Sequence, residues 1–227
     1  MPLPFAEHIW LIEGSLIDVA GFQYPTRAAV IKLETGELVI WSPVALDAVL
    51  KNEIDQIGPV RYLIAPNTFH HVFLRDWQSA YPAAQLFGPS ALRKKRLDLS
   101  FHGDLDGGTA LPWQAELPHV MVANKLTPES VFFHRVSQTV LFTDLIQQFP
   151  VGWHKGWRGI IARLDLMVGD APNVPRKFRL GFGPKEKARA MVKPILDWPC
   201  ERIIMAHGTP VTNDGAATLR RTFDWLF

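Results

Sequence analysis

Three apolar stretches of the sequence each end in side chains that can bind a metal ion. They are "LIAPNTFHH" (63–71) with His70 and His71, "TVLFTD" (139–144) with Asp144, and "RIIMAHG" (202–208) with His207. Imidazole nitrogens and carboxylates at separate strand ends suit zinc, manganese or iron. Such an ion lowers the pKa of bound water and polarises a substrate oxygen, so the expected chemistry is hydrolysis.

Each of these side chains also has an ordinary structural interpretation. His207 could be a strand-end histidine that bonds to the backbone, and Asp144 could cap a helix that begins at Leu145. The side chains of adjacent residues point in different directions, so we expect one of His70 and His71 to face the site and the other to be structural.

Three further residues are expected to line a cleft beside these strand ends. Asn67 lies in the turn before the two histidines, where asparagine tolerates unusual backbone angles. Ser42 follows the apolar run "LVIW" and precedes a proline, so it is also a candidate N-cap for the next helix. His154 belongs to the segment "GWHKGW", which could fold over the cleft.

The elements that must position these residues alternate between strands and helices. Apolar, β-branched runs predict strands, and helical spacing of apolar residues predicts helices between them. The predicted strands include "AAVIKL", "LVIW", "VRYLIA", "AAQLFG", "HVMVAN", "SVFFHRV", "TVLFTD" and "RIIMAHG". This alternation indicates an α/β fold, and the absence of a linker or repeat predicts one domain over residues 1–227.

Four segments resemble the motifs of the metallo-β-lactamase-like superfamily, in the superfamily's order and over residues 40–212. They are "GELVIWSPV", "VRYLIAPNTFHH", "TVLFTDL" and "RIIMAHGTPV". The match is closest to a little-characterised branch that shares "GELVIWSP", "APN…HH" and "AHG". The resemblance implies a four-layer αββα sandwich with the site along one edge of its two sheets.

The chain also departs from the superfamily's metal motif. Whichever way "APNTFHH" is aligned with His-x-His-x-Asp-His, at most two of the four ligand positions keep a side chain that can bind metal. No histidine stands within "VANKLTPES" (122–130), where the superfamily has its middle ligand, although His119 lies just before it, and Ser42 replaces an aspartate. The resemblance therefore implies one divalent metal, with zinc favoured over manganese and iron, rather than two.

Composition excludes several other kinds of protein. The 227 residues are 48% hydrophobic and 20% charged with a net charge of +2, which is typical of a globular protein. A single cysteine, Cys200, excludes an internal disulfide framework, and its apolar surroundings predict an inert thiol. We expect neither a signal peptide nor a membrane span, and so a cytoplasmic location.

Three functions remain open from the sequence. The favoured one is a metal-dependent hydrolase in which metal-bound hydroxide attacks an ester-, lactone- or thioester-like bond of an unidentified small molecule, with Asp144 as ligand or base. The alternative is a metal-free, non-catalytic protein of the same fold that binds a ligand or a partner. A nuclease is disfavoured, because the basic clusters Arg93–Arg96 and Arg176–Lys187 are local.

Overall fold

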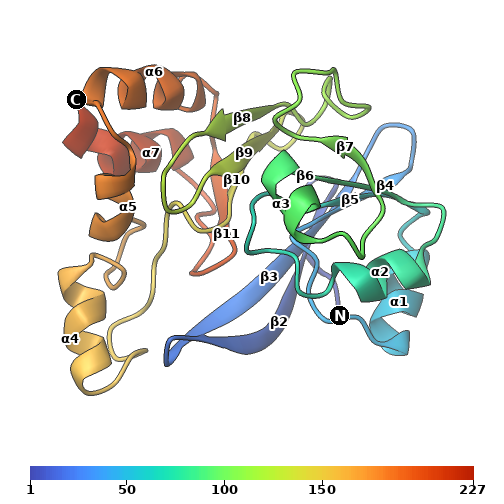
Figure 1. Cartoon of the computed structure of the whole chain (residues 1–227), viewed down its shortest axis with the longest axis horizontal. Coiled ribbons are helices and arrows are strands. Elements are labelled where there is room, and N and C mark those ends of the chain that lie inside the picture. Colours follow the sequence, from blue (N-terminus) through green and yellow to red (C-terminus); the bar gives the residue numbers. More distant parts are fainter. The chain divides into compact units, whose positions relative to one another are not determined.

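The computed structural model describes residues 1–227, which form two compact units (Figure 1). Unit 1 contains Met1–Ser15 and Thr26–Glu116, and unit 2 contains Leu16–Pro25 and Leu117–Phe227. The chain therefore enters unit 2 twice, first in a hairpin tip and then in its second half. The expectation of one domain over residues 1–227 stays a prediction.

A seven-stranded sheet follows the order of the chain from β1 to β7. Its strands are β1 (Leu3–Ala6), β2 (Ile9–Val19), β3 (Phe22–Lys32), β4 (Leu38–Trp41), β5 (Val60–Ile64), β6 (Gln85–Gly88) and β7 (Phe101–Asp104). β4 pairs antiparallel with β3 and parallel with β5, and β5, β6 and β7 continue in parallel. β4 is buried along its whole length, as expected for a central strand of a sheet.

Three short helices of unit 1 pack against one face of this sheet. They are α1 (Ala48–Asp55), α2 (Leu74–Ala80) and α3 (Ser90–Lys95). Leu50, Trp77 and Leu92 from these helices share one apolar cluster with Val30, Ile40, Leu63 and Leu86 of the strands. The expected strands and helices of this half of the chain are confirmed.

The expectation that Ser42 caps the first helix is wrong. α1 begins at Ala48, and its N-cap is Asp47, whose Oδ1 atom accepts the N–H of Leu50 at 2.7 Å. Ser42 instead has a positive φ of 54° and directs its hydroxyl toward the backbone of β3. The proline after it starts a non-helical segment, so the helix begins several residues later than predicted.

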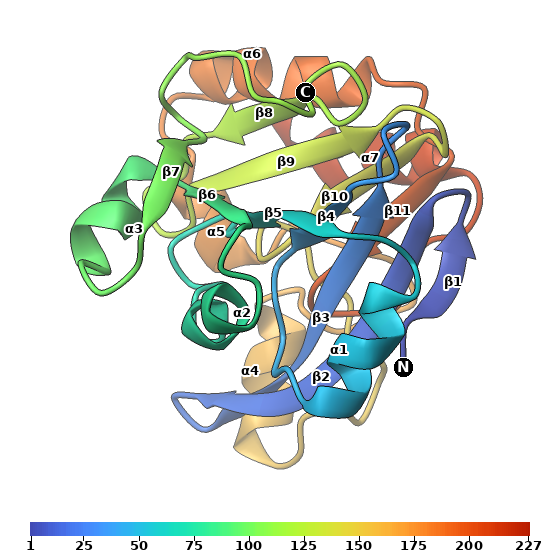
Figure 2. The same cartoon turned by 90° about the vertical axis from the view of Figure 1, so that its right-hand side faces the viewer.

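Unit 2 is built on a four-stranded sheet in the order β11-β10-β9-β8 (Figure 2). The strands are β8 (His119–Val122), β9 (Glu129–His134), β10 (Thr139–Phe142) and β11 (Arg202–Met205). β9 and β10 form an antiparallel hairpin, and β10 and β11 run parallel. The carboxyl ends of β10 and β11 therefore lie at the same edge of the sheet.

The helices of unit 2 are α4 (Trp157–Leu164), α5 (Arg176–Gly181), α6 (Lys185–Leu196) and α7 (Gly215–Phe223), followed by the 3-10 turn η1 (Asp224–Leu226). α6 and α7 cover one face of the sheet, with Val192 and Leu219 in the same apolar cluster as Phe133, Phe142 and Ile203 (Figure 1). None of the helices in the structure has the length and apolar character that crossing a membrane requires.

Candidate metal centre

His207 follows β11 by two residues and is 3% exposed. Its Nδ1 atom lies 2.7 Å from the carbonyl oxygen of Pro25, which also belongs to unit 2. A carbonyl oxygen only accepts hydrogen bonds, so the network assigns the proton of a neutral His207 to Nδ1. The lone pair then lies on Nε2, which is the arrangement found in metal-binding histidines whose second nitrogen is hydrogen-bonded.

Asp144 stands beside His207 because of the register of two parallel strands. Phe142 of β10 pairs with Met205 of β11, and each precedes its functional residue by two positions. The Oδ1 atom of Asp144 lies 3.2 Å from Nε2 of His207, and Asp144 is 9% exposed. The structure thus brings these two predicted site residues together.

The electrostatics of this pair favour a cation. If Nδ1 of His207 carries the proton, Nε2 and the Asp144 carboxylate present two acceptors to each other, and these repel. Either a second proton on the imidazole or a positive ion close to both atoms removes this repulsion. Nitrogen and carboxylate donors are ligands that zinc accepts, so the donor set fits a divalent metal.

The residue after His207, Gly208, lies where the backbone passes very close to that of Gln148. Its φ is +146°, and a Cβ atom at this position would lie 2.5 Å from the backbone oxygen of Gln148. The N–H of Gln148 in turn donates to the carbonyl of His207 at 3.2 Å. Only glycine allows the two segments to approach this closely, and their contact fixes the backbone of His207.

Glu129, which the sequence did not single out, holds the backbone around Asp144. This residue of β9 is fully buried, and its carboxylate accepts the N–H groups of Thr143, Asp144 and Leu145 at 2.7, 2.8 and 3.0 Å. Burial, followed by the nearby charge of Asp144, raises the pKa of Glu129 to about 7. Its signal in the sequence is an acidic residue directly before the apolar run "SVFFHRV".

The structural alternative for Asp144, a helix cap before Leu145, is wrong. No helix begins there, and residues 145–149 form a loop of bends and isolated bridges. The N–H of Leu145 is bound by Glu129, so it needs no cap from Asp144.

His70 lies in unit 1, in the loop after β5, and its Nδ1 atom is 2.7 Å from Oγ of Ser42. The Ser42 hydroxyl donates its single proton to the carbonyl of Arg27 at 2.9 Å. It must therefore accept from Nδ1–H of His70, which assigns the lone pair of this imidazole to Nε2. His70 and His207 thus have the same tautomer.

Asn67 is fully buried and shapes the loop that carries His70. Its Oδ1 atom accepts the N–H of Phe69 at 2.8 Å and that of His70 at 3.0 Å, which is an asparagine turn. The chain can reverse after β5 because this side chain satisfies two buried backbone donors.

His71 has a different environment from His70. Its Nδ1 atom is 2.7 Å from the guanidinium of Arg96, and its Nε2 atom is 3.1 Å from the ammonium of Lys95. Burial, together with the charges of Lys95 and Arg96, lowers the pKa of His71 below its ordinary value. Both ring nitrogens thus face cations.

Tyr24 is a second residue that the sequence did not single out. Its ring meets that of His207 edge to face, with the centroids 5.1 Å apart. Burial, and then the charges of Asp144 and Asp165, raise the pKa of Tyr24 to about 12. The phenol therefore stays neutral at physiological pH and remains a hydrogen-bond donor.

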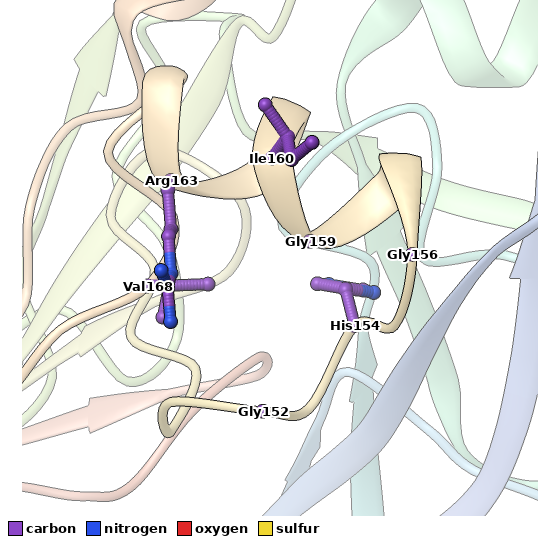
Figure 3. Close-up of a pocket in the computed structure, with 7 residues that line it drawn as sticks. All are labelled: Gly152, His154, Gly156, Gly159, Ile160, Arg163 and Val168. Atoms are coloured by element: carbon purple, nitrogen blue, oxygen red, sulfur yellow. The ribbon is translucent and has the colours of Figure 1, made fainter.

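His154 lies in the loop before α4, where its ring packs against those of Phe22 and Phe149. It lines a pocket of about 220 Å³ in unit 2, and Figure 3 shows it opposite Arg163. Burial, and then the charge of Lys177, lower the pKa of His154. Its predicted place in a substrate cleft stays a prediction.

Solved structures share the fold of the entire chain. A metallo-β-lactamase from Pontibacter korlensis is 10% identical, with a TM-score of 0.66 over 100% of this chain and 98% of the other. One from Hirschia baltica is 12% identical, with a TM-score of 0.62 over 100% and 97%. One from Pseudomonas aeruginosa in its mono-zinc form is 12% identical, with a TM-score of 0.59 over 100% and 95%.

These likenesses confirm the predicted α/β, metallo-β-lactamase-like fold, and at this identity they show the fold alone. Residues 6–155 match the profile of a family described as "Domain of unknown function (DUF4336)". A comparison with curated proteins finds no match.

Proposed function

The chain belongs to the DUF4336 family and has the metallo-β-lactamase fold, and from this premise we propose that it is a metal-dependent hydrolase with a mononuclear site. The observation that carries the proposal is the pair formed by His207 and Asp144. Its buried imidazole has its proton directed to Pro25 and its second nitrogen directed to a carboxylate oxygen at 3.2 Å. A positive charge close to both atoms would remove the repulsion between the Nε2 lone pair and the carboxylate.

We propose Asp144 and His207 of unit 2 as protein ligands of one divalent ion, with zinc as the expected metal, and we retain His70 as the third ligand that the sequence predicts. Three protein ligands are the usual number for catalytic zinc. The tautomers support this set, because Ser42 and Pro25 each occupy an Nδ1 atom and leave the lone pair on Nε2. The proposal leaves out His71, since a metal would have to compete there with two cationic side chains.

A bound divalent cation would supply Lewis acidity to water and to a substrate oxygen. The residues of the chain would keep the site oriented and move the proton. Pro25 holds the plane of the His207 ring, and the Asp144 carboxylate is the candidate acceptor for a proton released from water. The neutral phenol of Tyr24 can donate to an oxygen that becomes negative in an ester, lactone or thioester.

Metal analysis of protein purified without chelator tests the proposal. We expect close to one zinc, manganese or iron per chain in the wild type, and loss of that metal in His207→Ala. His102→Ala is the matched control, because His102 is an exposed histidine of β7 in unit 1. Wild-type protein that folds normally without metal, with a melting temperature that chelator does not change, would contradict the proposal and favour the non-catalytic alternative.

Activity provides a second, separate measurement. Chromogenic esters, lactones and thioesters should be hydrolysed by the metal-loaded wild type, and chelator should abolish the reaction. Readdition of zinc should restore it. A hydrolysis rate that survives complete removal of the metal would show that the chemistry does not depend on the ion.

A further inference from the structure

We propose that Glu129 is a positioning residue, whose carboxylate fixes the loop that presents Asp144 to the metal. This inference rests on the proposed function. Glu129 is the first residue of β9, and Asp144 follows the neighbouring strand β10. Both belong to unit 2, so the contact lies within one compact unit.

The two oxygens of Glu129 bind three consecutive N–H groups. Oε1 accepts from Thr143 at 2.7 Å, and Oε2 accepts from both Asp144 and Leu145 at 2.8 and 3.0 Å. A carboxylate is a stronger acceptor than a neutral group, and three bonds to one short segment fix both its position and its direction. The segment includes the backbone of Asp144, so the direction of the Asp144 side chain follows from it.

Burying a carboxylate at this position is energetically unfavourable unless its hydrogen bonds hold the loop of residues 143–145. Glu129 has an exposed fraction of 0%, and its hydrogen bonds go to backbone N–H groups of the loop and to the side chain of Thr143, not to a basic side chain. Burying a charge without a cationic partner is unfavourable, and a smaller neutral residue could fill a strand position at lower cost.

The variant Glu129→Gln tests the hydrogen bonds of Glu129 while the volume of the side chain stays nearly the same. Glutamine has nearly the same shape, but one of its two terminal groups is an NH2 donor. In either orientation of the amide, its NH2 group faces a backbone N–H of residues 143–145, so at least one of the three hydrogen bonds is lost. We expect the dissociation constant of zinc to rise by about 10- to 100-fold, as for the loss of other hydrogen bonds that support metal ligands.

Two readouts distinguish positioning from a purely structural role. The first is the zinc dissociation constant, measured by competition with a chromophoric chelator. The second is the visible absorption of the cobalt(II)-loaded protein, which reports ligand geometry. Thr139→Val is the matched control, because this buried hydroxyl bonds to Ser137 at the other end of β10. We expect it to lower the melting temperature while the zinc affinity and the cobalt spectrum stay unchanged.

These measurements distinguish a failure of the inference about Glu129 from a failure of the proposed function. If the wild type binds no metal, the proposed function fails. If the wild type binds metal, and Glu129→Gln binds zinc with unchanged affinity and an unchanged cobalt spectrum, only the role of Glu129 is overturned. Should Glu129→Gln not fold, Glu129→Asp keeps the charge but shortens its reach. It should weaken zinc binding as well, and unchanged affinity in that variant would also overturn the inference.

Discussion

Nε2 of His207 lies 3.2 Å from Oδ1 of Asp144, while Nδ1 of the same ring lies 2.7 Å from the carbonyl oxygen of Pro25. The ring is therefore held between a neutral acceptor and a charged one. Its Nδ1 proton is directed to Pro25, so either a second proton or a cation between Nε2 and the Asp144 carboxylate would remove the repulsion of the two acceptors.

Asp144→Asn should remove most of the metal affinity while the protein stays folded. Asparagine has the same size, but it lacks the negative charge that attracts the ion and repels Glu129. Zinc binding should weaken by at least the roughly 10- to 100-fold that loss of a supporting hydrogen bond costs. Metal-free Asp144→Asn should be no less stable than the metal-free wild type, as measured by thermal unfolding. Equal zinc affinity in the two proteins would exclude Asp144 as a ligand.

Ser42→Ala and Ser42→Gly should both weaken metal binding, by about 10- to 100-fold, because each removes the acceptor that orients His70. The two variants should differ in stability. The backbone of Ser42 has a φ of 54°, which glycine adopts without strain, so the glycine variant should unfold at the higher temperature. Titration with zinc and thermal unfolding of the metal-free proteins check both parts. A variant that keeps wild-type affinity would show that the hydroxyl does not orient the ligand.

Gly208→Ala should lower the free energy of unfolding by about 1–3 kcal/mol, as for other overpacked positions. The added methyl group would lie 2.5 Å from a backbone oxygen of Gln148, on a residue whose φ is already +146°. Gly169→Ala is the control in the same unit, because a Cβ atom there meets nothing within 4 Å. Denaturant unfolding should show a loss only for Gly208→Ala. Similar stabilities of the two variants would contradict the close approach at His207.

Cys200 should resist thiol reagents in the native protein at pH 8. Burial raises the pKa of this thiol from 9.0 to about 12, so only roughly one molecule in ten thousand carries the thiolate at pH 8. The corresponding stability is fully present below pH 9 and is lost as the pH rises toward 12, because the unfolded chain releases this proton first. A chromogenic disulfide reagent should react at once in denaturant and slowly without it. Rapid reaction of the folded protein would contradict a buried thiol.

Local patterns in the sequence were sufficient for most of the fold. The runs "VRYLIA", "TVLFTD" and "RIIMAHG" became β5, β10 and β11, because β-branched apolar side chains pack well on the pleated surface of a buried strand. The pairing of Asp144 with His207 could be anticipated only from the family resemblance, since the chain gives no local signal of the register between β10 and β11.

The sequence by itself determined the strands, the strand-end positions of the candidate ligands and the α/β class. The tertiary structure decided which atoms surround the candidate ligands. Glu129 precedes Asp144 by 15 residues and reaches its loop because β9 pairs with β10. Tyr24 lies far from His207 in the chain and meets its ring because the hairpin tip of β2 and β3 belongs to unit 2. Tautomers, hydrogen bonds and buried charges depend on such distant contacts, which no local pattern of residue types encodes.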